Sequence, residues 1–120
     1  MQPERSDSTF LLVAGLCAQW CGTCRDYLPL FEQQAQRFTN TARFVWIDIE
    51  DHAEVLGTID VEDFPTLLIA RGDEVLFFGT VMPHANTLGR LVQGAVDGDL
   101  KPLSDPDLAG LPQRVRAAML

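Results

Sequence analysis

The stretch Ala18-Gln19-Trp20-Cys21-Gly22-Thr23-Cys24-Arg25 contains two cysteines that are three positions apart. It follows an apolar run, Phe10 to Cys17, which is typical of a strand buried on both faces. After it, apolar side chains recur at helical spacing, at Leu28, Phe31, Ala35 and Phe38. We therefore expect Cys21 where a strand meets the N-terminus of a helix. Unpaired backbone N–H groups and the helix dipole favour a thiolate there.

The two cysteines supply the thiols that thiol–disulfide exchange requires. We expect Cys21 to be the nucleophile and Cys24, one turn further into the helix and more buried, to be the resolving thiol. The alternative is a structural pair or half of a zinc site. A structural zinc ion needs four ligands, and only Cys17, His52 and His84 could complete such a set. The pattern therefore favours redox chemistry, with no metal and no organic cofactor.

The pattern Trp20-Cys21-Gly22-Thr23-Cys24 resembles the active site of the thioredoxin family. Pro29 and Phe64-Pro65-Thr66 lie where family members carry a helix-kinking proline and a cis-proline that faces the dithiol. The resemblance covers about residues 10 to 96. It implies a thioredoxin fold with Cys21 and Cys24 as catalytic residues. It also implies a substrate-binding surface formed by Trp20, Gly22, Thr23, Phe64, Pro65 and Thr80.

The order of the expected elements predicts the same α/β fold independently of the motif. We predict strands at 10–17, 43–49, 66–70 and 75–81, and helices at 22–38, 51–59 and 84–96. Asp51 is the expected N-cap of the second helix. The first half of this order requires a parallel strand pair joined by a crossover helix, and the second half adds an antiparallel hairpin. The result is a central mixed β-sheet flanked by helices.

Both ends of the chain extend beyond the resemblance. We predict a flexible tail at 1–9, a thioredoxin-like domain at 10–97, and a linker with a short C-terminal helix at 98–120. Leu111, Val115 and Met119 would pack this helix back onto the domain. The alternative is a contact for a partner or a second subunit. We expect a monomer, with a dimer through the C-terminal helix as the other option.

Several positions depart from thioredoxin itself. Gly15 stands where thioredoxin buries an aspartate, and Trp46 stands where it has the lysine that neighbours this aspartate. Val81, which follows Thr80, stands where thioredoxin has a loop glycine. Cys17 stands where it has a second tryptophan. We predict Cys17 to be buried and unpaired, the alternative being a third exchanging thiol. Because no carboxylate can be assigned beside Cys24, we expect its attack on mixed disulfides to be slow near neutral pH. A Gly15→Asp change would speed turnover if the site holds the side chain.

Composition restricts the classes of partner. The 120-residue chain carries 17 acidic and 9 basic residues, a formal charge of −8, so it has no basic stripe for nucleic acid. No apolar run approaches the ~20 residues of a membrane span. Phe10 to Ala18 could pass for a signal-peptide core, but Glu4 and Asp7 against Arg5 give the preceding segment the wrong charge. We expect a cytoplasmic protein that binds neither nucleic acid nor membrane.

The sequence favours a thiol–disulfide oxidoreductase that reduces disulfides of protein partners with electrons from a dithiol reductase. The alternative is a thioredoxin-fold binding or assembly module with a vestigial dithiol. Gly15, Trp46 and Val81 favour the module, whereas Cys21, Cys24 and Pro65 favour the enzyme.

Overall fold

The computed structural model describes residues 10–18, 22–57, 59, 61, 64–82 and 84–118. Within these residues, four strands form one mixed sheet in the order β2-β1-β3-β4. The strand β1 pairs in parallel with β2 and antiparallel with β3, and β3 and β4 form an antiparallel hairpin. The predicted mixed α/β sheet is therefore confirmed. The strand bounds are Leu11–Cys17 (β1), Ala42–Asp48 (β2), Thr66–Arg71 (β3) and Glu74–Thr80 (β4).

The strand β1 lies in the interior of the sheet and is buried along its whole length. Leu11 and Val13 pack into the core on one face, and Leu12, Ala14 and Leu16 pack into the core on the other. Successive side chains of a strand point to opposite faces, so a strand covered on both sides must be apolar throughout. This explains why residues 10–17 lack the alternation of a half-exposed strand.

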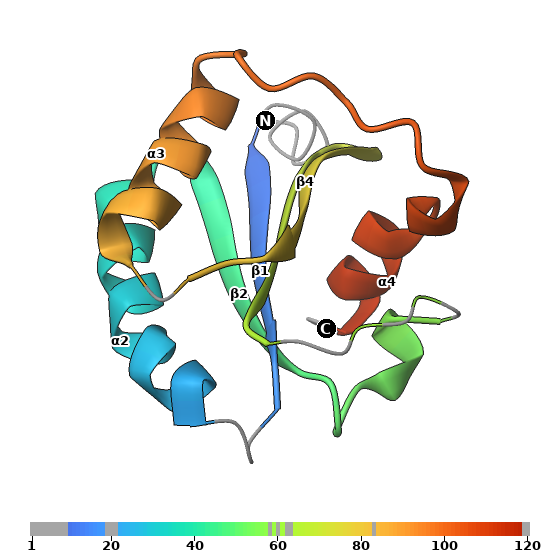
Figure 1. Ribbon diagram of the computed structural model, residues 1–120. Coiled ribbons are helices and arrows are strands. Elements are labelled where there is room, and N and C mark those ends of the chain that lie inside the picture. Colours follow the sequence, from blue (N-terminus) through green and yellow to red (C-terminus); the bar gives the residue numbers. More distant parts are fainter. Residues whose placement is uncertain are drawn as a thin grey trace.

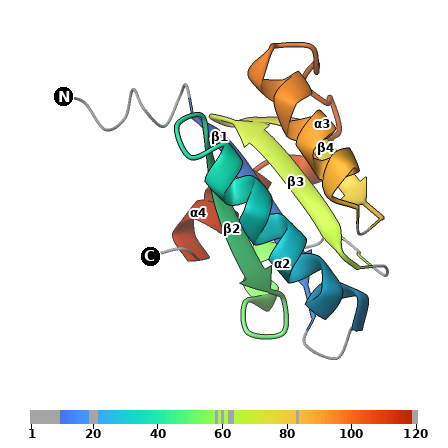
Figure 2. The ribbon, with the colours of Figure 1, turned by 90° about the vertical axis from the view of Figure 1, so that its left-hand side faces the viewer.

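Helices cover both faces of the sheet, which gives three layers (Figures 1 and 2). The helices α2 (Gly22–Arg37) and α3 (Ala85–Val96) lie side by side on one face, where Tyr27, Phe31, Leu88 and Val92 are buried. The opposite face is covered by the 3₁₀ turns η1 (Ala53–Val55) and η2 (Pro106–Leu108) and the helix α4 (Leu111–Ala118). As expected for this arrangement, β1 and β2 are joined by α2 as a crossover.

The predicted helix at 51–59 is wrong in extent, because the structure has only the single 3₁₀ turn η1 there. The residue that caps this turn is His52, not Asp51, and its side chain makes no capping hydrogen bond. Val55 is the one residue of the turn that is buried. Gly57 has φ +60°, a left-handed conformation that ends the turn. The other elements differ from their predicted ranges by one or two residues at an end, as is usual for fraying termini.

The helix α4 packs back onto the sheet through Leu111 and Val115, which are fully buried. Arg114 ties it to η1, since its Nε donates a hydrogen bond of 2.7 Å to the Val55 carbonyl and its Nη2 one of 3.4 Å to the Leu56 carbonyl. Met119 and the tail at 1–9 lie outside the described residues. The domain boundaries remain a prediction.

Candidate redox site

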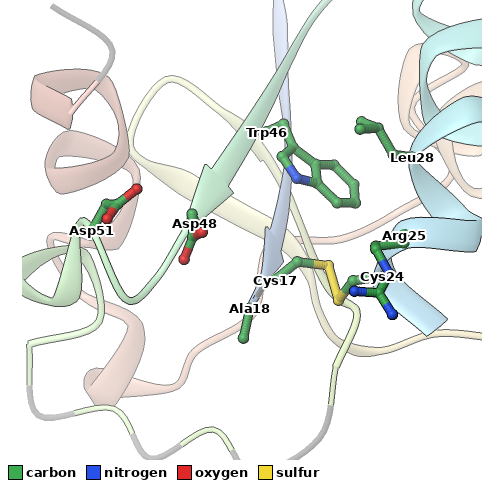
Figure 3. A pocket seen from close by; sticks show the side chains of 8 residues that line it. All are labelled: Cys17, Ala18, Cys24, Arg25, Leu28, Trp46, Asp48 and Asp51. Carbon is green, nitrogen blue, oxygen red and sulfur yellow. A yellow bond between two sulfur atoms is a disulfide. The ribbon is translucent and has the colours of Figure 1, made fainter. Parts of the chain in front are cut away.

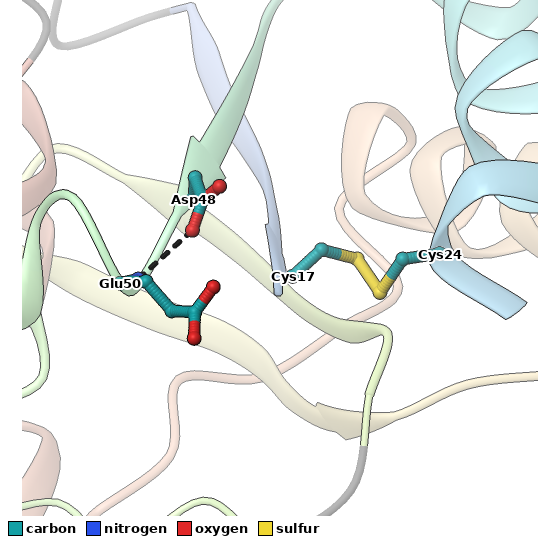
Figure 4. Close-up of a disulfide and its surroundings, with 4 residues drawn as sticks. All are labelled: Cys17, Cys24, Asp48 and Glu50. Carbon is teal, nitrogen blue, oxygen red and sulfur yellow. Dashed lines mark hydrogen bonds between the residues drawn. A yellow bond between two sulfur atoms is a disulfide. The ribbon is translucent and has the colours of Figure 1, made fainter. Parts of the chain in front are cut away.

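The centre of the candidate site is a disulfide between Cys17 and Cys24 (Figure 4). Cys17 is the last residue of β1, and Cys24 is the third residue of α2. Their Cα atoms are 5.9 Å apart, within the range that disulfides require. Both side chains are buried, each about 2% exposed. The end of the central strand is thus covalently joined to the first turn of the crossover helix.

The prediction that Cys17 is buried is confirmed, and the prediction that it is unpaired is wrong, because its sulfur is bonded to that of Cys24. Cys17 and Cys24 line the same pocket, and their Cα atoms are 5.9 Å apart. No residue pattern specifies how close the end of a strand lies to the first turn of the helix that follows it. Trp20 and Cys21 lie outside the described residues, so the catalytic role of Cys21 and the exposure of Trp20 stay predictions.

A pocket of about 570 Å³ lies beside the disulfide, and the carboxylate-bearing residue Asp48 is one of the residues that line it (Figure 3). Asp48 is the last residue of β2 and the register partner of Cys17 on β1. Paired residues of neighbouring strands project from the same face of a sheet. Asp48 is half-buried, and its Oδ1 accepts a hydrogen bond of 2.9 Å from the Glu50 N–H. The lining residues are Cys17, Ala18, Cys24, Arg25, Leu28, Trp46, Asp48 and Asp51.

Sequence reasoning did not assign Asp48 to the site, although a signal was present. Once β1 and β2 are parallel, the residue at which β2 ends must lie beside the end of β1. The two apolar runs alone leave the register open by one or two residues, and a shift of one would turn Asp48 to the other face. The site therefore contains a carboxylate that the strand β1 itself lacks.

The position of the missing aspartate is filled by an aromatic ring. Gly15 pairs with Trp46 across β1 and β2, and a Cβ added at Gly15 would lie 2.9 Å from two ring carbons of Trp46. The Trp46 ring also meets Phe31 edge-on, with centroids 5.2 Å apart. The site thus has no room for an aspartate at position 15, which removes the basis for faster turnover by a Gly15→Asp variant.

The predicted cis peptide bond between Phe64 and Pro65 is confirmed. Pro65 is buried, and its carbonyl accepts a hydrogen bond of 3.1 Å from the Val81 N–H. Because Leu16 pairs with Thr66, Pro65 lies at the same end of the sheet as Cys17. Thr80 pairs with Thr66 at this end, and Val81, at the position of the expected glycine, is buried.

The other predicted substrate-binding residues differ in exposure. Gly22 and Thr23 are exposed in the first turn of α2, Thr80 is exposed at the end of β4, and Phe64 is half-buried. Within the predicted set that the structure describes, Gly22 and Thr23 directly precede Cys24 at the start of α2, and Pro65 and Thr80 lie at the same end of the sheet. These positions suit a surface that receives an extended peptide, and their role in binding remains a prediction.

Tyr27 is a buried polar residue next to this site. It lies one helical turn after Cys24, is 1% exposed, and packs against Phe31 and Trp46 with ring centroids 6.2 and 6.3 Å away. Its hydroxyl has no hydrogen-bond partner among the described residues. Burial raises the pKa of Tyr27 to about 12, because the ionised phenolate would lose its hydration.

Across the ranges that the structure covers, no three histidine, cysteine or acidic side chains gather in a way that could hold a metal ion. His52 lies 3.5 Å from Glu54 on the η1 turn, and His84 is exposed before α3. None of the described helices is long and apolar enough to cross a membrane.

The sequence itself matches a known family over most of its length. The model of the thioredoxin family matches residues 5–92. The chain belongs to the thioredoxin family. It is 43% identical over 68 residues to thioredoxin H2-1 of Oryza sativa, a match that spans 57% of this chain and 49% of that protein. It is 31% identical over 83 residues to a thioredoxin of Listeria monocytogenes, which spans 63% of this chain and 81% of the relative. The chain thus spans about half the length of the rice thioredoxin.

Solved structures confirm the thioredoxin fold. The thioredoxin Deadhead of Drosophila melanogaster superposes with a TM-score of 0.66 at 22% identity, over 75% of this chain and 84% of that one. A thioredoxin of Trypanosoma brucei brucei gives the same TM-score at 24% identity, over 78% and 81% of the two chains. Family membership, together with a cysteine pair that forms a disulfide, supports thiol–disulfide chemistry in general terms.

Proposed function

We propose that this chain is a thiol–disulfide oxidoreductase that reduces disulfides of protein partners through Cys21 and Cys24. The observation that carries the proposal is that Cys24 forms a disulfide at the first turn of α2, at the sheet end where Pro65 precedes β3. A thioredoxin-family chain whose helix-start cysteine is held within bonding distance of another thiol has the parts that disulfide exchange needs.

The first step is attack by Cys21 on a substrate disulfide. Cys21 immediately precedes Gly22, the first residue of α2. The N–H groups at the start of a helix and the positive end of its dipole favour the thiolate, which is the attacking species. A bond forms between Cys21 Sγ and one substrate sulfur, and the other substrate sulfur leaves as a thiolate.

The second step is resolution of this mixed disulfide by Cys24. Its thiolate attacks Cys21 Sγ, the second substrate sulfur leaves, and the two cysteines are left oxidised. Cys24 is buried, so its proton must pass to a group inside the site. We propose Asp48 as that acceptor, because it lines the same pocket and projects from the same face of the sheet as Cys17. Electrons then return from a dithiol reductase, and the expected cytoplasmic location belongs to the same proposal.

Reduction of insulin in the presence of dithiothreitol tests the function. The wild-type chain should accelerate insulin precipitation, and both Cys21→Ser and Cys24→Ser should return the rate to that of dithiothreitol alone. Asn40→Ser is a matched control, because it introduces a serine at an exposed turn at the opposite end of the sheet and should leave the rate unchanged. A wild-type rate at the background level would instead favour a binding module with a vestigial dithiol.

A further inference from the structure

Cys17 is the sulfur that neither the proposed reaction nor the family motif uses. It is nevertheless bonded to Cys24, the proposed resolving thiol, and both are almost completely buried. A sulfur atom takes part in one disulfide at a time. Cys24 bonded to Cys17 therefore leaves Cys21 as a thiol, and Cys24 bonded to Cys21 leaves Cys17 as one.

Chain length limits how far apart the three cysteines can lie. Cys21 is three residues before Cys24 and four after Cys17. Even a fully extended chain places its Cα no more than about 11 Å from that of Cys24 and about 14 Å from that of Cys17. The structure already holds the Cα atoms of Cys17 and Cys24 at 5.9 Å. A disulfide requires Cα atoms within about 7 Å, and these upper limits are compatible with pairing of Cys24 with either of the other two cysteines.

We infer that Cys17 is a third redox-active cysteine and that the disulfide migrates between Cys21–Cys24 and Cys17–Cys24. The inference rests on the proposed function. In the step, Cys17 Sγ attacks Cys24 Sγ, so that the Cys17–Cys24 bond forms and the Cys21–Cys24 bond breaks. The proton lost by Cys17 is regained by Cys21 or released to solvent when Cys21 stays ionised. One disulfide and two electrons are conserved, so no outside oxidant is needed.

The surroundings of Cys17 suit this role. Asp48, its register partner, lines the same pocket and is the acceptor that we propose for the Cys17 proton. Arg25 and Asp51 are the other charged residues that line the pocket. The leaving sulfur, Cys21, directly precedes α2, whose N-terminus stabilises a leaving thiolate. The oxidised chain then stores its disulfide in the interior and keeps a nucleophilic thiol at Cys21. Such a chain can form a mixed disulfide with a second substrate before it is reduced.

The position of the free thiol in the oxidised chain tests the inference. Wild-type chain with one disulfide is acid-quenched and its free thiol alkylated with N-ethylmaleimide. The disulfide is then reduced and its two cysteines are labelled with the deuterated reagent. Trypsin cuts after Arg5 and Arg25, so one peptide carries all three cysteines and fragment ions locate each label. We expect the light label on Cys21 in a substantial fraction of molecules. Light label on Cys17 alone would overturn the inference.

Two variants and one further probe sharpen this result. Cys17→Ala should lose the light label entirely, because its only disulfide is Cys21–Cys24. Cys21→Ser should still form a Cys17–Cys24 disulfide, and its failure to do so would contradict the inference. Oxidised wild type incubated with glutathione disulfide should gain one glutathione on Cys21 while its internal disulfide persists, and Cys17→Ala should not. These readouts need no turnover, so they are independent of the insulin assay that tests the function.

Discussion

Gly15 and Trp46 are register partners on β1 and β2, and the Trp46 ring occupies the space that a side chain at position 15 would need. The resemblance to thioredoxin assigns a buried aspartate and a lysine to these two positions. Here they form an apolar contact that continues into Phe31 and Tyr27. The charge pair has been replaced by packing, and any carboxylate that serves the cysteines must come from another element.

A side chain at position 15 should therefore destabilise the fold. A Cβ 2.9 Å from the Trp46 ring forces the ring or the strand to move, and such overpacking costs about 1–3 kcal/mol. We expect Gly15→Ala to lower the free energy of unfolding by this amount in urea denaturation, and Gly15→Asp to lower it further because the carboxylate is buried. The control is Gly79→Ala, whose Cβ would lie 3.7 Å from Phe77 in ordinary contact. A Gly15→Asp variant that is as stable as the wild type and turns over faster would contradict this expectation, because it would mean that the Trp46 ring moves aside.

Asp48→Asn should slow resolution of mixed disulfides. Asparagine keeps an oxygen to accept the Glu50 N–H but cannot take a proton. General-base catalysis contributes about 10²–10⁴-fold, so we expect a fall of at least about 10²-fold in single-turnover resolution near neutral pH, with partial recovery as pH rises. Glu50→Gln removes an equal charge from an exposed neighbour and should change the rate little. Equal rates for wild type and Asp48→Asn would contradict this role and would mean that another group accepts the Cys24 proton.

Tyr27 can be titrated directly, because it is the chain's single tyrosine. Burial raises its pKa to about 12 in the folded chain, against 10.0 for an ordinary tyrosine. As the pH rises, Tyr27 ionises in the unfolded chain before it ionises in the folded one. The proton on Tyr27 therefore contributes to the stability of the fold fully below pH 10, and this contribution is lost as the pH rises toward 12. Tyrosinate absorbance of the folded protein should therefore show a midpoint near 12. A midpoint near 10 would mean that the hydroxyl reaches water.

Tyr27→Phe tests the same residue by stability. The variant removes a buried hydroxyl that has no partner in the described structure, and an unsatisfied buried group costs about 1–3 kcal/mol. We expect Tyr27→Phe to have a higher free energy of unfolding than the wild type at neutral pH. Its stability should also lack the loss above pH 10 that ionisation of Tyr27 causes in the wild type.

Arg114 should anchor the C-terminal helix. Its guanidinium donates to the carbonyls of Val55 and Leu56, so Arg114→Met leaves two partly buried acceptors without a charged donor. We expect the free energy of unfolding to fall by about 1–3 kcal/mol. Arg43→Met, at an exposed position of β2, serves as the control, and it should lower the free energy of unfolding by less than half as much. Equal losses for both variants would show that α4 is held by Leu111 and Val115 alone.

Several features of this molecule follow from residue patterns. The unbroken apolar run of β1 predicts a strand covered on both faces, and the helical spacing of Leu88, Val92 and Ala95 predicts the buried side of α3. The cis bond before Pro65 follows from resemblance, not from periodicity.

The rest depends on tertiary geometry. The Cys17–Cys24 bond depends on how close the end of β1 lies to the first turn of α2, and the position of Asp48 depends on the register of two parallel strands. The apolar spacing at 51–59 predicted a helix that is longer than the turn η1 in the structure. Val55 is the only residue of η1 that is buried, so packing against the core does not stabilise a longer helix there.

The central claim is that Cys21 is the thiol that attacks substrates, and two single-cysteine chains test it most directly. Cys17→Ser/Cys24→Ser retains only Cys21, and Cys17→Ser/Cys21→Ser retains only Cys24, which is 2% exposed in the structure. Their rates of mixed-disulfide formation with insulin at mildly acidic pH are compared by mass spectrometry. Because a pKa lowered by one increases the thiolate fraction about tenfold, we predict that the Cys21 chain reacts at least about tenfold faster. Equal rates, or a faster Cys24 chain, would contradict the account.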